Sequence, residues 1–145
     1  MSWETLLAKA IAVAATAHQN QFDRSGKPYI LHPLRMMFRL EDPRARIAAV
    51  LHDVVEDTPI SLADLGQAGF PEEILTAVDA LTKREGEPYE TFVQRAAVNP
   101  IARQVKIADL EDNMDLKRLN GPISDKDKAR LSKYHSAWQK LKSEA

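Results

Sequence analysis

Residues 42–59 read Asp-Pro-Arg-Ala-Arg-Ile-Ala-Ala-Val-Leu-His-Asp-Val-Val-Glu-Asp-Thr-Pro. The Asp-Pro pair is typical of a helix start and the Thr-Pro pair of a helix end, so one helix is predicted to run to about Asp57. Between Ile47 and Val55 this helix is apolar around nearly its whole circumference, which predicts that it is buried. Charged side chains on a buried helix cost several kcal/mol unless their charge is compensated.

Four polar side chains follow each other on this helix. His52 and Glu56 are i,i+4 neighbours, as are Asp53 and Asp57, and the two pairs are offset by about 100°. If His52 and Asp53 hold a metal, Glu56 and Asp57 lie one turn further on, within reach of a water beside it. The alternative is a buried, hydrogen-bonded histidine next to acids in solvent. Three acids on one apolar helix disfavour that alternative.

Two more residues complete a candidate metal site. His32 stands in Tyr-Ile-Leu-His-Pro, and Asp109 stands in Lys-Ile-Ala-Asp-Leu. Two imidazoles and two carboxylates suit one divalent cation of intermediate hardness. The predicted ligands are His32, His52, Asp53 and Asp109. A site of this kind most often indicates hydrolysis of a phosphate ester.

The segment around Asp109 carries further candidates. Lys106, Asp109 and Asn113 have i, i+3, i+7 spacing and share one helix face. A lysine beside a ligand carboxylate can bind a substrate phosphate, and the Asn113 amide can hold a sugar hydroxyl. A surface salt bridge from Lys106 to an acid is the alternative.

The helical period dominates the rest of the chain, and no stretch alternates like a strand. The fold is therefore predicted to be all-α, a single domain spanning 1–145 and forming one compact bundle of seven to eight helices. Helices are predicted from Ser2 to His18, from Pro33 to Leu40, from Asp42 to about Asp57, from Ser61 to near Gly66 and Gly69, from Pro71 to Leu81, and from Tyr89 to Val98. A further helix starts at Asn99-Pro100 and holds Asp109, Asn120-Gly121-Pro122 breaks the chain, and the last helix runs from Ser124 to Leu141.

Composition narrows the functional class. The 145 residues are 44% hydrophobic and 28% charged, which is ordinary for a globular protein. A net charge of −1 with interspersed signs argues against a dedicated nucleic-acid binder. Without cysteine there are no disulfides and no cysteine-ligated zinc, and a cytoplasmic setting is expected. The apolar N-terminus is interpreted as a helix rather than a signal peptide, and no association with a membrane is expected.

Three segments carry a family resemblance. Residues 24–33, residues 51–58, and residues 105–109 with Asn113 resemble three motifs of the hydrolase domain of RelA/SpoT-type enzymes. Weaker similarity extends from about residue 8 to residue 140. The closest likeness is to stand-alone small alarmone hydrolases, which include metazoan SpoT homologues.

The resemblance implies an HD-domain fold and a manganese-dependent reaction. The 3′-diphosphate of guanosine tetra- or pentaphosphate would be hydrolysed to pyrophosphate and GDP or GTP. Glu56 and Asp57 would position and activate the attacking water. One Mn²⁺ would be bound by His32, His52, Asp53 and Asp109.

The substrate is expected to be a small nucleotide. Arg24 and Lys106 are predicted to contact phosphate, Asn113 to contact the sugar, and Tyr29 to pack over the nucleotide. The chain departs from the family motifs in two places, at Asp23-Arg24, where two basic residues are usual, and at residues 110–113, where a basic residue and a His-Asn pair are usual. These departures leave the base open between guanine and adenine, and a homodimer is compatible with the sequence.

Two other functions remain open from the sequence. A general HD-family nucleotidase would remove a 5′-phosphate, which the Glu56-Asp57 pair disfavours. A nucleotide-binding sensor would have lost turnover.

Overall fold

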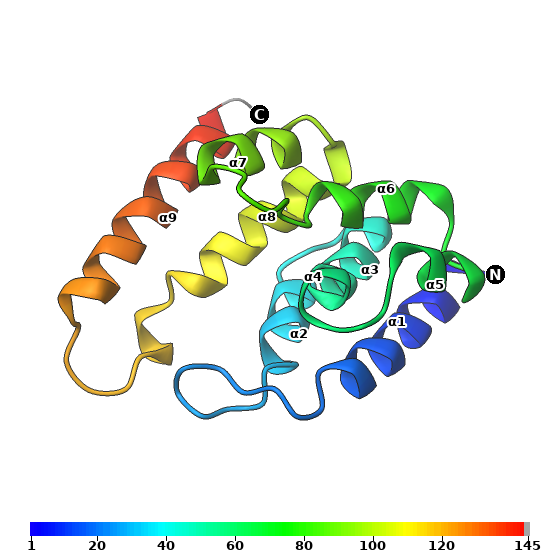
Figure 1. Cartoon of the computed structure of the whole chain (residues 1–145), viewed down its shortest axis with the longest axis horizontal. Helices are drawn as coiled ribbons and strands as arrows, with labels where there is room; N and C mark the ends of the chain where they lie inside the picture. Colours follow the sequence, from blue (N-terminus) through cyan, green and yellow to red (C-terminus); the bar gives the residue numbers. More distant parts are fainter. Residues whose placement is uncertain (144–145) are drawn as a thin grey trace.

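The computed structural model describes residues 1–143, and that part of the chain is built from helices (Figure 1). The only β-type pairing in it is an isolated bridge between Phe22 and Pro28. The predicted all-α class is confirmed. The elements are α1 (Trp3–Ala17), α2 (Leu31–Phe38), α3 (Pro43–Leu51), α4 (Val54–Asp57), α5 (Leu62–Gln67), α6 (Glu72–Ala80), α7 (Tyr89–Ala97), α8 (Pro100–Asn113), a 3₁₀ turn η1 (Leu116–Arg118) and α9 (Asp125–Ser143).

Side-chain caps explain where several helices begin. The Ser2 hydroxyl accepts a hydrogen bond from the Thr5 amide at the start of α1. Asp42 caps α3 and Asn99 caps α8, and both helices have proline in their first turn. Such caps satisfy backbone N–H groups that have no partner inside the helix. The helix starts predicted from the sequence therefore have a direct physical cause.

Helix α3 is the centre of the fold. It packs against α1, α2, α6 and α8 (Figure 1). Ile47, Val50 and Leu51 join the apolar cluster that α1 covers, whereas Ala48 and Ala49 face a second cluster shared with α8. All five side chains are fully buried, as the apolar sequence predicted. The end of α3 is therefore held rigidly from several sides.

The single helix predicted from Asp42 to about Asp57 is interrupted. Helix α3 ends at Leu51, and α4 begins at Val54. Both the backbone N–H of His52 and its ring Nδ1 reach the carbonyl of Ala49, three residues back, at 3.3 and 2.7 Å. A side chain that bonds to a backbone carbonyl of the helix interrupts the regular series of backbone hydrogen bonds and so ends or kinks the helix. The structure thus has nine α-helices in residues 1–143, or eight if α3 and α4 are counted together.

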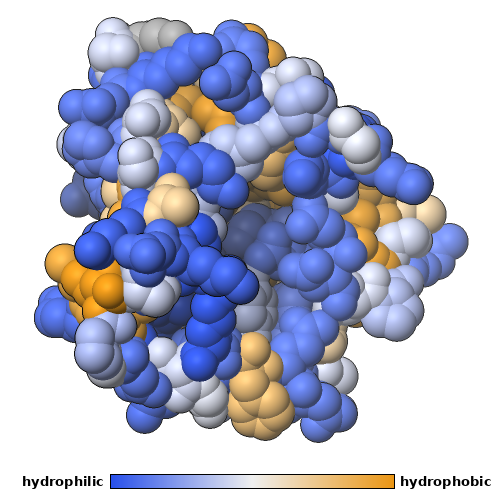
Figure 2. Space-filling view, turned by 60° about the vertical axis from the view of Figure 1, so that its left-hand side comes forward, coloured by the Kyte–Doolittle hydropathy of each residue, from blue (hydrophilic) through white to orange (hydrophobic). Residues whose placement is uncertain are grey.

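The face turned forward in Figure 2 is mostly hydrophilic and is hollowed near its centre. Helix α9 packs against α8 and α7 on this side of the bundle (Figure 1). Within residues 1–143, no helix has the length and apolar character needed to cross a membrane.

Candidate active site

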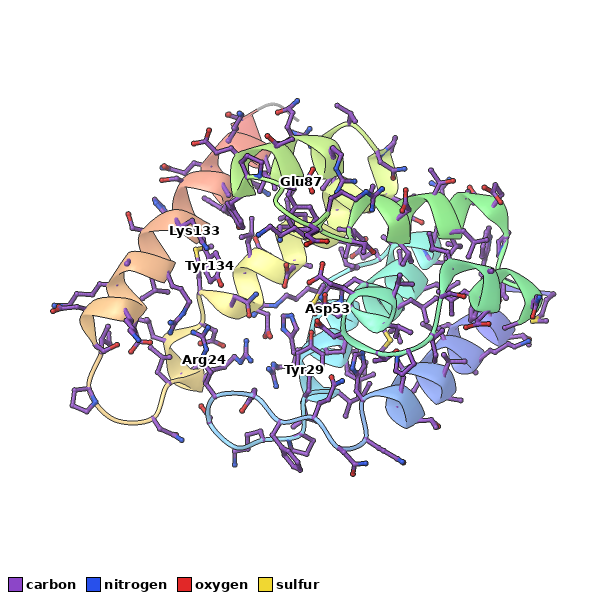
Figure 3. The ribbon with its side chains drawn as sticks, in the orientation of Figure 1. Arg24, Tyr29, Asp53, Glu87, Lys133 and Tyr134 are labelled. Atoms are coloured by element: carbon purple, nitrogen blue, oxygen red, sulfur yellow. The ribbon has the colours of Figure 1, made fainter. Side chains whose placement is uncertain are left out.

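A cleft of about 580 Å³ opens between the loop after α1, the junction of α3 and α4, and helices α7, α8 and α9 (Figure 3). This volume is within the range of small-molecule sites. Every site residue proposed from the sequence lines it, namely Arg24, Tyr29, His32, His52, Asp53, Glu56, Asp57, Lys106, Asp109 and Asn113.

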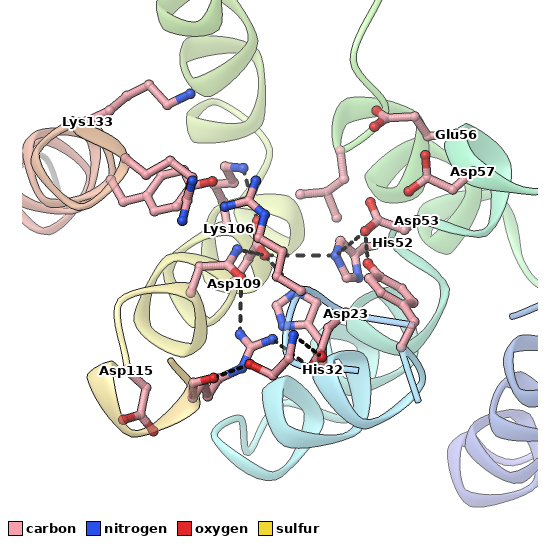
Figure 4. Close-up of a pocket in the computed structure, with 18 of the residues that line it drawn as sticks. Asp23, His32, His52, Asp53, Glu56, Asp57, Lys106, Asp109, Asp115 and Lys133 are labelled. Atoms are coloured by element: carbon pink, nitrogen blue, oxygen red, sulfur yellow. Dashed lines mark hydrogen bonds and ion pairs between the residues drawn. The ribbon is translucent and has the colours of Figure 1, made fainter. Parts of the chain in front are cut away.

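Three buried side chains with potential metal-ligand atoms meet at the base of this cleft (Figure 4). The Nε2 atom of His32 lies 3.0 Å from Oδ1 of Asp109, and Nε2 of His52 lies 4.0 Å from the same oxygen. Ligand atoms of all three residues lie within 4.8 Å of one another, and each residue is less than a tenth exposed. Helix α2, the end of α3 and the middle of α8 each contribute one residue.

Hydrogen bonds fix the orientation of both imidazoles. Nδ1 of His52 lies 2.7 Å from the carbonyl of Ala49, which can only accept, so Nδ1 carries the proton. Nδ1 of His32 donates in the same way to Asp112, at 2.6 Å. The two Nε2 atoms are thereby left for a ligand, which is how metal-binding histidines are normally held. The residues present therefore fit a divalent cation.

Asp53, the fourth predicted ligand, lies at the edge of this group. Its Oδ2 is 3.2 Å from Nε2 of His52 and accepts a hydrogen bond from the Tyr29 hydroxyl. By the spacing of its oxygens it groups with Glu56 and Asp57, within 4.8 Å of both. The structure thus brings three predicted ligands together directly and places the fourth between them and the two acids.

The charged side chains of the site stabilise one another. Burial alone would raise the pKa of the Asp109 carboxyl, but Lys106 and the two histidines hold it well below its usual range. Burial opposes protonation of His52, yet its attraction to Asp53 and Asp109 raises its pKa to about 9. A cation would replace the imidazole protons as the compensating positive charge.

Glu56 and Asp57 are exposed on the wall of the cleft beside Asp53 (Figure 4). Oε1 of Glu56 accepts a 2.7 Å hydrogen bond from the amide of Lys83, so the loop after α6 holds this side chain. The pKa of Asp57 is raised to about 6 by partial burial and by the negative charges of Asp53 and Glu56. A carboxylate with such a pKa is suited to accept a proton near neutral pH.

We expect the Asp57 carboxyl of the metal-free protein to titrate near pH 6, with the carboxylate form present above that pH. Added cation should lower this pKa, because a positive charge near Asp53 favours the ionised form. Carboxyl ¹³C NMR measures both values, and Asp57→Asn assigns the signal. A titration at about 4 in the metal-free protein would contradict the expectation.

Lys106 does pair with an acid, Asp109, but this ion pair is buried and not at the surface as the alternative supposed. Its Nζ lies 3.0 Å from Oδ2 of Asp109 and 4.8 Å from the centre of the Phe92 ring. Asn113 also binds Asp109, through a 2.9 Å bond to Oδ1. The predicted shared helix face is therefore real, but both side chains contact the carboxylate first. Arg24 is exposed at the cleft.

Several residues in the cleft or behind it were not among the site residues predicted from the sequence. Asp112 and Arg118 form the support behind His32, and the i,i+3 spacing of Asp109 and Asp112 was the available signal. Lys133 and Tyr134 of α9 line the side away from Glu56 and Asp57 (Figures 3 and 4). Packing of α9 against α8, which is not encoded locally, places them there.

Comparisons with known proteins give sequence relatives, although no family model matches the chain. The probable GTP pyrophosphokinase of Mycobacterium leprae is 34% identical over 139 residues, which are 87% of this chain and 18% of that protein. The guanosine-3′,5′-bis(diphosphate) 3′-pyrophosphohydrolase of Borreliella burgdorferi is 40% identical over 79 residues, 52% of this chain and 12% of that protein.

The bifunctional (p)ppGpp synthase/hydrolase SpoT of Escherichia coli is 30% identical over 123 residues, 74% of this chain and 17% of that protein. The chain thus spans less than a fifth of the length of these relatives. Among solved structures, a metazoan ortholog of SpoT that hydrolyses ppGpp has the same fold. It superposes with a TM-score of 0.76 at 22% identity, covering 94% of this chain and 84% of that one.

Proposed function

We propose, from the premise that this chain is a relative of the RelA/SpoT-type (p)ppGpp hydrolase domains, that it hydrolyses the 3′-diphosphate of a guanosine tetra- or pentaphosphate. The products would be pyrophosphate and GDP or GTP. The observation that carries this proposal is the pairing of two groups in one cleft. A buried set of two imidazoles and a carboxylate adjoins three acids that begin at Asp53.

The proposed cofactor is one Mn²⁺ ion. His32, His52 and Asp109 would hold it through the atoms that already converge, and Asp53 would complete the set beside His52. Mixed imidazole and carboxylate donors suit a cation of this hardness. When bound, the cation polarises the phosphoryl group and lowers the pKa of the attacking water.

Glu56 and Asp57 are proposed to orient the attacking water and accept its proton. Both carboxylates lie beside Asp53 rather than against the buried histidines, so they are available to a water. The Lys83 amide holds one oxygen of Glu56, which leaves the other free. The raised pKa of Asp57 suits this carboxylate to accept the proton of the water.

The nucleotide is proposed to lie along the cleft from this centre toward α9. Arg24, which is exposed in the loop after α1, would contact a phosphate of the substrate. The buried ammonium of Lys106 adds positive charge beside Asp109. Asn113, which also lines the cleft, would contact a sugar hydroxyl, and Tyr29 would pack over the nucleotide while its hydroxyl donates to Asp53. Hydrolysis assays with guanine and adenine nucleotides would distinguish the two possible bases.

We expect Arg24→Ala and Lys106→Met to lower kcat/KM by roughly 10- to 150-fold each, because a hydrogen bond to a charged group is worth about 1.5–3 kcal/mol. Steady-state kinetics at low salt measures the effect. Lys27→Ala, in the same loop as Arg24 but outside the cleft, is the control. Unchanged kcat/KM for both variants would place these cations outside the substrate site.

One experiment tests the proposed function directly. Mn²⁺-loaded protein is incubated with a panel of 3′- and 5′-phosphorylated guanine and adenine nucleotides, and the products are separated by chromatography. We expect intact pyrophosphate from 3′-diphosphates and no reaction with 5′-monophosphates. Orthophosphate released from 5′-monophosphates would assign the chain to the nucleotidases. Tight binding without turnover would make it a sensor.

A further inference from the structure

A second carboxylate lies behind the candidate metal centre. Asp112 is fully buried, and its Oδ2 accepts the 2.6 Å hydrogen bond from Nδ1 of His32. Asp109, one turn earlier on α8, meets the opposite nitrogen of the same ring at 3.0 Å. The imidazole of His32 is therefore clamped between two aspartates of one helix.

Two arginines form hydrogen bonds with the carboxylate of Asp112, and a third, Arg39, lies 3.9 Å from its Oδ1. Arg35 donates from Nε to Oδ1 at 2.8 Å, and Arg118 donates from Nη1 to Oδ2 at 2.9 Å. The carboxylate is thus an acceptor only, and the bond from His32 must be donated by Nδ1–H.

This arrangement has a cost that the local fold alone does not explain. A fully buried aspartate that needs two arginines is expensive, and an apolar residue of similar volume usually packs as well. It also stands at one of the positions where the chain departs from the motif that it resembles. The His-Asn pair usual there is Asp112-Asn113 in this chain.

We propose that Asp112 is a positioning residue for the divalent cation. It holds His32 in the tautomer whose Nε2 is free to bind metal, and its negative charge makes that nitrogen a stronger donor. Arg35 and Arg118 keep the charge in place. This inference rests on the metal site of the proposed function, but it needs no nucleotide.

The test is a titration of the purified protein with Mn²⁺ alone, followed by calorimetry or by the EPR signal of free Mn²⁺. Asp112→Asn keeps the shape and one acceptor but removes the charge. We expect it to weaken Mn²⁺ binding about 10- to 100-fold, the usual effect of losing such an outer partner. The control is Asp42→Asn, which removes an arginine-paired carboxylate from the start of α3.

Asp42→Asn should bind Mn²⁺ like the wild type. Binding by Asp112→Asn within twofold of the wild type would overturn the inference while leaving the proposed function intact. A wild type that binds no Mn²⁺ would overturn both. Weakened Mn²⁺ binding by Asp112→Asn, in a protein that does not hydrolyse 3′-diphosphates, would support the inference and refute the function.

A measurement on the wild type decides the matter even if Asp112→Asn fails to fold. Long-range ¹H–¹⁵N NMR of the protein loaded with diamagnetic Zn²⁺ distinguishes the two ring nitrogens, and His32→Gln assigns the signals. We expect Nδ1 of His32 to carry a strongly hydrogen-bonded proton and Nε2 to bind the metal. A proton on Nε2, with Nδ1 bound to metal, would overturn the inference.

Discussion

Asp53→Ala is expected to lose bound Mn²⁺ and hydrolytic activity together. The substitution deletes an anionic oxygen 3.2 Å from Nε2 of His52, where the ligand group meets the acids of α4. Without that charge, three ligands must hold the cation and the phosphoryl group loses its polarisation. The Asp53 side chain is partly exposed, so its removal leaves no large cavity.

Metal content by mass spectrometry and initial rates on a 3′-diphosphate measure the two losses. Asp115→Asn serves as the control. It removes a carboxylate charge from the cleft lining, but Asp115 belongs neither to the metal-binding group of two histidines and Asp109 nor to the three acids that begin at Asp53. Full metal occupancy in Asp53→Ala would restrict the ligands to His32, His52 and Asp109.

Glu56→Gln and Asp57→Asn are expected to keep metal and nucleotide binding but to lose on the order of 10²–10⁴ in kcat. Each variant keeps the size of the side chain and removes its charge and basicity. In Glu56→Gln the new amide oxygen can still accept the hydrogen bond from the Lys83 amide, so the loop should stay in place. Rapid-quench turnover of bound substrate separates chemistry from binding.

Glu85→Gln, an exposed acid in the loop after α6, is the matched control and should turn over normally. Near-normal kcat in both active-site variants would remove Glu56 and Asp57 from the chemistry. The protein would then resemble nucleotidases that do not depend on this pair.

Local sequence signals predicted most of the fold. Caps such as Asp42 and Asn99 mark helix starts, and the uninterrupted apolar run of α3 indicates burial from all sides. Both signals act within a few residues of the chain, so no tertiary information is needed to interpret them. The sequence did not predict the break after Leu51. The break goes with a hydrogen bond from the His52 ring to a backbone carbonyl, and this bond depends on the side-chain conformation of His52, which the sequence pattern does not specify.

Residues near the metal centre were harder to place. The spacing of Lys106 from Asp109 placed both residues on one helix face, but it did not show that the rings of Phe92 and Tyr89 pack over the Lys106 ammonium. Asp112 was missed because its partners come from α2 and η1. Contacts between distant segments depend on packing, which periodicity does not encode.

The three buried metal-binding groups come from α2, from the residue after α3 and from α8, and Asp109 on α8 is far along the chain from the two histidines, so the three meet only in the folded protein. An ion bound there would act as a reversible cross-link, and unfolding would have to release it. At a free ion concentration of about 100 times its dissociation constant, such linkage adds about 2.7 kcal/mol to the free energy of unfolding. Metal supply would then set the lifetime of the folded protein as well as its reactivity, and chelation would favour its degradation.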